Sequence, residues 1–279
     1  MPRSDDSRSK LFVRLATRAD IPAIIALSAR TYGEHMAYTP EMVGGQLTQF
    51  PGGQFVAEYD GEVVGYCATF CIAEAVALAP HGWREITGGG YASRHDVAGD
   101  WLYGMEVCVD PARRGLRIGR RLYDRRKRLC MQLDLKGIVF GGRLPGLAKR
   151  FKQFGSAQAY VDAVEEGRAR DLALSFQLGN QFEVIGVLPD YLPSDHESLG
   201  YAAHLVWRNP SFSDHPEIRK AQRSGDLPAA VRVATVQYQQ RRIKTFEEFA
   251  TQIEYFVDIA ADYRSDFVVF PELITLQLL

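Results

Sequence analysis

The feature that most constrains this chain is a strand that ends at a proline and is followed at once by an arginine-rich helix. Residues 101–109 have the composition of a strand, and Asp110-Pro111 ends it because proline cannot donate to a strand ladder. A helix is predicted over 119–135, with one apolar stripe and basic residues on its other faces. That stripe consists of Ile118, Leu122, Leu129 and Leu133.

The turn between this strand and helix has the composition of an anion-binding site. The first amides of a helix have no partner inside the helix and lie at the positive end of its dipole. Gly115 and Gly119 allow a close approach of the backbone to an anion, and Arg114, Arg117 and Arg120 add charged donors. The pattern therefore predicts a seat for phosphate groups.

Nine basic residues fall between Arg113 and Arg128, although the formal net charge of the chain is only −1. This concentration of positive charge suits a ligand with a pyrophosphate and a further ribose phosphate, as in CoA. A solvated basic helix is the alternative interpretation, and RNA binding is a weaker one because no aromatic stacking platform accompanies the helix. The near-zero net charge does not suggest nucleic acid or a membrane surface as a partner.

The same segment resembles motif A of the GNAT acetyltransferases, V-x-P-x-x-(Q/R)-x-x-G-x-(G/A). The matching residues are Val109, Pro111, Arg114 and Gly119, and Arg117 stands where the motif has its middle glycine. The order of predicted strands and helices over residues 11–207 also resembles this family, with longer segments near 71–100 and 144–175.

This resemblance implies an α/β (α+β) GNAT fold over residues 11–209, with a central mixed, mostly antiparallel sheet flanked by helices. It implies acetyl-CoA as co-substrate. No metal is expected, because no Cys or His cluster in the sequence has the spacing of zinc ligands. The backbone of Val107 and Val109 is expected to pair with the pantetheine arm, and Asp110-Pro111 to splay the strand open for it. The CoA-binding residues expected in the turn are Arg114, Gly115, Leu116, Arg117, Ile118, Gly119 and Arg120.

In GNAT enzymes an amine attacks the thioester directly, so the protein must position both substrates and take up a proton. Glu106, on the strand that leads into the motif, is the candidate base, acting directly or through water. Burial among apolar neighbours is expected to raise its pKa. The alternative interpretations are a strand-surface glutamate and a structural ion pair.

Many family members use a tyrosine to protonate the departing thiolate, and its expected position here falls on Phe176 or Gln177. Either the thiolate leaves without this acid or another residue serves, Tyr191 and Tyr201 being candidates. The acceptor is expected to be a small-molecule or peptide amine in a pocket shaped by residues 31–50 and 71–100. The aromatic candidates there are Tyr32, His35, Tyr38, Trp83 and Trp101.

The remaining pattern predicts a disordered tail at residues 1–10 and a tight hairpin at Asp60-Gly61. The other predicted strands are 11–15, 54–59, 62–70, 137–141, 182–188 and 199–207. One further helix is predicted after an N-cap at Thr17 and another from Pro40. Residues 156–178 are also predicted to be helical.

The composition indicates an ordinary globular protein, 46% hydrophobic and 24% charged. Its four cysteines form no CxxC pair and are predicted to be reduced core residues, which favours a cytoplasmic location. The sequence shows no signal peptide and no apolar run of the roughly 20 residues that a membrane helix needs.

A polar stretch at 210–229 is predicted to be a linker to a second domain, at 230–279. Residues 231–238, the helix after them and the Phe-Pro-Glu stretch ending at Glu272 resemble the start of the carbon–nitrogen hydrolase (nitrilase) superfamily. The resemblance implies that Glu272 is the general base of a Glu-Lys-Cys triad, and that homo-oligomers form through this part. No cysteine or lysine follows Glu272, so we expect an incomplete hydrolase domain; the alternative is a short helix–strand extension that packs on the first domain or on a partner.

Three functions remain open at this stage. The first is an N-acyltransferase, in a protein that is bifunctional with an amide or nitrile hydrolase. The second is a non-catalytic acyl-CoA-sensing domain attached to a hydrolase, and the absent tyrosine favours it. The third is a nucleic-acid-binding adaptor that uses the basic helix.

Overall fold

The computed structural model describes residues 11–212, 232–238, 243–263 and 265–271. Contacts divide the chain into two compact units, Met1–Ser224 and Gly225–Leu279. The predicted tail 1–10, most of the predicted linker 210–229, and Glu272 lie outside the described residues.

A seven-stranded sheet with the order β1-β2-β3-β4-β5-β7-β6 forms the centre of the first unit. Within this sheet β4 and β5 run parallel, and all other neighbouring strands are antiparallel. The predicted mixed, mostly antiparallel sheet is thus confirmed. The strands are β1 (Leu11–Leu15), β2 (Gln54–Tyr59), β3 (Glu62–Ile72), β4 (Trp101–Val109), β5 (Gly137–Arg143), β6 (Glu183–Leu188) and β7 (Ala202–Arg208).

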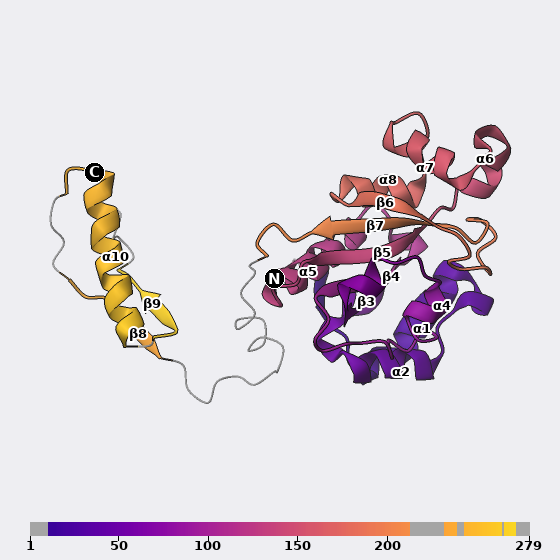
Figure 1. Ribbon diagram of the computed structural model, residues 1–279. Helices are drawn as coiled ribbons and strands as arrows, with labels where there is room; N and C mark the ends of the chain where they lie inside the picture. The colour runs from indigo at the N-terminus through magenta and orange to yellow at the C-terminus, as the bar shows by residue number, and fades with distance from the viewer. Residues whose placement is uncertain (1–10, 213–231, 239–242, 264, 272–279) are drawn as a thin grey trace, which may run out of the picture. The chain divides into compact units, whose positions relative to one another are not determined.

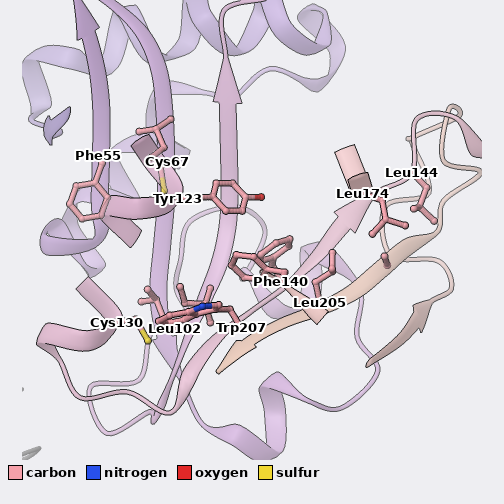
Figure 2. Close-up of a cluster of buried hydrophobic side chains, with 14 of the residues drawn as sticks. Phe55, Cys67, Leu102, Tyr123, Cys130, Phe140, Leu144, Leu174, Leu205 and Trp207 are labelled. Carbon is pink, nitrogen blue, oxygen red and sulfur yellow. The ribbon is translucent and has the colours of Figure 1, made fainter. Parts of the chain in front are cut away.

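Helices cover both faces of this sheet (Figure 1). One core cluster packs α1 (Ile21–Tyr32) and α2 (Pro40–Gln49) against the sheet; the cluster on the other face contains side chains of α5 (Ile118–Gln132), α7 (Ala157–Glu165) and α8 (Leu172–Gly179). Figure 2 shows part of this second cluster, in which Phe140 and Leu205 of the sheet lie near Tyr123 and Leu174 of the helices. Three short helices complete the unit: α3 (Glu74–Ala77), α4 (Trp83–Ile86) and α6 (Leu147–Phe154).

Local sequence signals account for most element boundaries. The side chain of Thr39 caps α2, and Asp60 and Gly61 both have positive φ, as a tight hairpin turn requires. The single helix predicted over 156–178 is wrong. Gly167, at φ +74°, lies in the turn that follows α7. The Asp171 side chain then caps α8 by accepting from two backbone amides.

Helix α5 corrects a second expectation. The predicted stripe of Ile118, Leu122 and Leu129 is buried, but so is Arg126, which is only 1% exposed. Arg126 lies about one turn after Leu122 and one turn before Leu129, so it is on the same face of the helix as these two leucines. One of the arginines expected in solvent therefore points into the protein.

The second unit contains the parallel strands β8 (Val233–Thr235) and β9 (Phe267–Val269), joined through α10 (Phe246–Asp262). The sequence predicts strands over 231–238 and 267–270, and within the described residues both are shorter. Alternate strand residues stay exposed, among them Val233, Phe267 and Val269, and so do Tyr255 and Tyr263. Unlike the first unit, this unit has little buried apolar surface, since Ala260 is its one buried hydrophobic residue among those described.

Candidate functional site

The site begins where β4 and β5 separate. These strands pair from Trp101 with Gly137 as far as Tyr103 with Val139, and within the described residues no strand pairs with this edge of β4 farther on. On its other edge β4 stays paired with β3 up to Val109, and the register shifts opposite Met105. The separation of β4 from β5 thus begins at Gly104, so the expectation that Asp110-Pro111 causes it is wrong.

A cavity of about 500 Å³ occupies this gap. Because the gap passes through the sheet, residues from both faces line it. From the sheet come Gly104–Val107 and Phe140–Arg143, from the α5 face Tyr123, Arg126 and Gln177, and from the α1 face Tyr32, Tyr38, Trp83 and Tyr191.

Glu106 lies in the wall of the cavity with its carboxylate held by two tyrosines. Tyr32 Oη donates to Oε1 at 2.8 Å, and Tyr38 Oη donates to Oε2 at 3.1 Å. Burial raises the pKa of Glu106, and these two hydrogen bonds oppose that rise because they favour the ionised form. No basic group among the described residues forms an ion pair with Glu106, which sets aside the structural ion pair.

Arg143, at the end of β5, ties the loop between β6 and β7 to the cavity. Its Nε and Nη2 both donate to the carboxylate of Asp195, each at 2.6 Å. Its guanidinium also lies 5.6 Å from the centre of the Tyr32 ring. Sequence reasoning missed this clamp, because Arg143 and Asp195 are 52 residues apart and match no motif.

A buried chain of hydrogen bonds starts at Tyr191. Its hydroxyl lies 2.9 Å from that of Tyr103, which lies 2.8 Å from His81 Nε2. His81 Nδ1 lies 2.7 Å from the carbonyl oxygen of Ala79, so Nδ1 carries the proton and Nε2 accepts from Tyr103. Burial lowers the pKa of His81, and that of the neighbouring His204 to about 4, so both are neutral near pH 7.

The region where the resemblance expects a tyrosine acid is built differently. Phe176 packs against Gly119, whose added Cβ would lie 3.1 Å from the ring, and Gln177 lines the cavity. Tyr123 of α5 meets the edge of the Phe176 ring and also lines the cavity; burial raises its pKa to about 12. Of the two candidates named from sequence, Tyr191 lines the cavity and Tyr201 does not.

The predicted phosphate seat lies at the start of α5. Gly115 has φ +94° and Arg117 φ +59°, so the turn has the left-handed conformation that glycine favours. In the described part of the chain, the amides of Ile118, Gly119 and Arg120 donate to no protein acceptor. Arg114, Leu116, Arg117 and Arg120 are exposed, whereas the Ile118 side chain is in the core.

The structure brings four of the five aromatic candidates for the acceptor pocket into the wall of the cavity. Tyr32, His35, Tyr38 and Trp83 line the cavity, together with Met42. Trp101 does not, because it is 1% exposed at the start of β4 and packs against Gly137.

A shallower groove of about 660 Å³ lies over α1 and the hairpin turn at Gly61. Its charged groups pair with one another, Arg14 with Asp20 and Arg30 with Asp110. We therefore treat the gap between β4 and β5 as the candidate site.

Among the described residues, no three His, Cys, Asp or Glu side chains come together as metal ligands. None of the described helices has both the length and the apolar character needed to cross a membrane.

Comparison with known proteins agrees with this architecture. Residues 21–145 match the profile of the Acetyltransferase (GNAT) family. A solved GNAT-like decarboxylase, GphF, in complex with isobutyryl-CoA is 26% identical, with a TM-score of 0.61 over 71% of this chain and 99% of that one. The loading GNATL domain of CurA from Lyngbya majuscula shares the fold at 18% identity and a TM-score of 0.62, over 72% of this chain and 98% of that one.

Two curated relatives come from Bacillus subtilis (strain 168). "Probable hydrolase YhcX" is 39% identical over 97% of this chain and 52% of its own length, so the chain spans about half of that relative. "Uncharacterized N-acetyltransferase YkwB" is 29% identical over 71% of this chain and 89% of its own length. The first unit thus has the GNAT fold, and the family match and the solved structures support a GNAT acetyltransferase domain in this part of the chain.

Proposed function

We propose that the first unit transfers an acyl group, in the simplest case acetyl, from acyl-CoA to the amine of a small molecule or peptide. The observation that carries this proposal is the gap between β4 and β5, which has the Glu106 carboxylate in its wall. The strand that borders this gap, β4, leads to the unpaired amides at the start of α5. Such a gap lets a thioester and an amine approach from opposite faces of the sheet and meet in a fixed geometry.

We assign the CoA moiety to the α5 side. Its pyrophosphate would accept from the amides of Ile118, Gly119 and Arg120, with Arg114 and Arg117 as charged donors. Gly115 provides the positive φ that the turn needs, and Leu116 lies exposed beside it. The pantetheine arm would pair with the open edge of β4 at Val107 and Val109.

We assign the amine to the α1 side, among Tyr32, Tyr38 and Trp83. The amine nitrogen attacks the thioester carbon, a C–N bond forms, the C–S bond breaks, and Glu106 takes the proton from the amine directly or through water. The raised pKa brings this carboxylate closer to the operating pH, where a base is most effective. A proton on the leaving sulfur completes the reaction, and Tyr191 and Tyr123 are the hydroxyls in the cavity wall that could supply it.

Replacing Glu106 by Gln tests the base. Since a base must be ionised, we expect the wild-type rate to fall as the pH drops through the raised pKa of Glu106, above the usual range for glutamate near 4.3. In Glu106→Gln this acid limb should vanish and kcat should fall about 10²–10⁴-fold, with the Kd for CoA unchanged. Glu183→Gln, at an exposed position on β6, is the control. An E106Q enzyme with wild-type kcat would contradict the assignment.

The decarboxylase relative favours a second reaction at the same site. In a carboxylated acyl-CoA, the bond to the carboxylate would break, its electron pair would pass to the thioester enolate, CO2 would leave and the carbon would take up a proton. Malonyl-CoA incubated without an amine should then yield acetyl-CoA and CO2, measured by chromatography against a heat-unfolded control. Malonyl-CoA that stays intact over many hours would exclude this reaction. Binding of acyl-CoA without either reaction, on every amine tried, would favour the sensing alternative.

We also propose that the second unit is the opening segment of a carbon–nitrogen hydrolase domain, which would make the whole protein bifunctional. The parallel β8 and β9 joined through α10, and their uncovered apolar residues, support a larger parallel sheet or an oligomer contact here. The hydrolase name of a relative about twice as long is consistent with it. The buried thiols of the first unit suit the reducing cytoplasm expected for such a protein.

Glu272 is the base that we assign to this hydrolase. In a form that contains the rest of such a domain, Glu272→Gln should abolish amide hydrolysis, measured as ammonia release, and leave acyl transfer unchanged. Glu247→Gln, at an exposed position in α10, should change neither activity. Hydrolysis at the wild-type rate in the E272Q variant would contradict this role.

A further inference from the structure

The cavity contains a buried positive charge that the reaction described above does not use. Arg126 reaches the gap between β4 and β5 from α5, is 1% exposed, and lines the cavity. None of the ion pairs among the described residues includes it. A charge removed from water without a counter-ion destabilises the fold, so arginines this deeply buried are normally paired.

The protein satisfies only part of this guanidinium. Nη2 donates to the carbonyl oxygen of Glu106 at 2.6 Å and, more weakly, to that of Ala68 at 3.5 Å. Nε is buried and has no partner, and the hydrogen bonds of this guanidinium to backbone oxygens come from Nη2. Another polar neighbour is the Cys67 thiol, which carries no formal charge and whose pKa is raised by burial. The group fits beside β4 because residue 104 is glycine; an added Cβ there would lie 2.6 Å from Nη1.

The nearby negative charge is directed elsewhere. The Glu106 carboxylate faces α1 and receives hydrogen bonds from Tyr32 and Tyr38, whereas Arg126 belongs to the α5 face. The rings of Tyr123 and Phe140 flank the guanidinium, with centres 5.5 and 5.9 Å from its carbon, and they supply no formal charge. Gln177 Oε1, also in the cavity wall, is another buried polar atom without a partner. The wall of the cavity thus contains a guanidinium whose donors the protein satisfies only in part.

We propose that Arg126 is the counter-ion for a carboxylate at the end of the acyl group. The site then prefers acyl-CoA thioesters of short dicarboxylic acids, of which malonyl-CoA is the simplest. This inference rests on the acyl-CoA site proposed above. The binding step is non-covalent, and no bond is made or broken in it.

The direction of approach supports this assignment. A thioester whose phosphates lie at the start of α5 enters the gap at its open end, beside Val109. From there to Gly104, where the strands meet, β4 spans five residues, or about 17 Å. The far end of the acyl group therefore points toward the closed end of the gap, which is where Arg126 lies beside Gly104.

The test compares two ligands of similar shape and different charge. Malonyl-CoA ends in a carboxylate, and acetoacetyl-CoA has a methyl ketone in its place. If chromatography shows that malonyl-CoA is decarboxylated during the titration, succinyl-CoA and 4-oxopentanoyl-CoA replace the pair, because a carboxylate one carbon farther from the thioester cannot leave by this route. Calorimetric titration of the 279-residue chain at pH 7 should give a Kd for malonyl-CoA about 10- to 100-fold below that for acetoacetyl-CoA, as expected for hydrogen bonds to a charged group.

The variants assign this preference to one side chain. Arg126→Met should reduce the ratio of the two Kd values to about one, mainly by weakening malonyl-CoA binding. Arg128→Met removes the same charge from an exposed position of the same helix and should keep the wild-type ratio. If Arg126→Met does not fold, as judged by its melting curve, Arg126→Lys keeps the charge and should keep a preference for malonyl-CoA.

Equal Kd values for the two ligands in the wild-type protein would overturn the proposal, and this measurement needs no variant. An R126M protein that loses affinity for both ligands equally would also overturn it, because Arg126 would then act on the backbone or the thioester carbonyl. If neither ligand nor acetyl-CoA binds, the acyl-CoA site itself is wrong. Binding of acetyl-CoA without a preference for malonyl-CoA would contradict only the role of Arg126.

Discussion

Beyond Tyr103, strand β4 is paired with β3 along one edge and no longer with β5 along the other. The site depends on this asymmetry. A strand edge without a partner presents backbone donors and acceptors that must find other partners. Here the edge borders a cavity that passes through the sheet, so an extended polar ligand can pair with it. The helices on the two faces then bring different chemistry to the same gap.

The two faces bring groups of opposite charge to the same residue of β4. On the α1 face, two tyrosines hold the carboxylate of Glu106; on the α5 face, Arg126 donates to the carbonyl of the same residue. One residue of β4 thus places its carboxylate on the α1 face and anchors a buried cation with its backbone carbonyl. The shift of register opposite Met105 and the missing side chain at Gly104 make room for this arrangement.

The sequence was sufficient to predict the sheet, the hairpin at Asp60-Gly61, and a Glu106 whose pKa is raised by burial. These features depend on local signals: alternation, turn residues, and one compact motif. The break between α7 and α8 was missed because the Asp171 cap competes with a continuous apolar pattern. The buried position of Arg126 was missed because a charged residue on a basic helix is ordinarily solvated, and only the gap beneath it makes burial possible. The pair of Arg143 and Asp195 joins residues far apart in the chain, which no single-sequence pattern can bring together.

The account depends on CoA lying along the open edge of β4 with its phosphates at the start of α5. Backbone amide NMR shifts during a titration with acetyl-CoA test this most directly. We predict the largest shifts at the amides of Val107, Val109, Ile118 and Gly119, with little change at Gly61 in the shallow groove. Shifts concentrated around Gly61 and Arg113, with none along β4, would contradict the account.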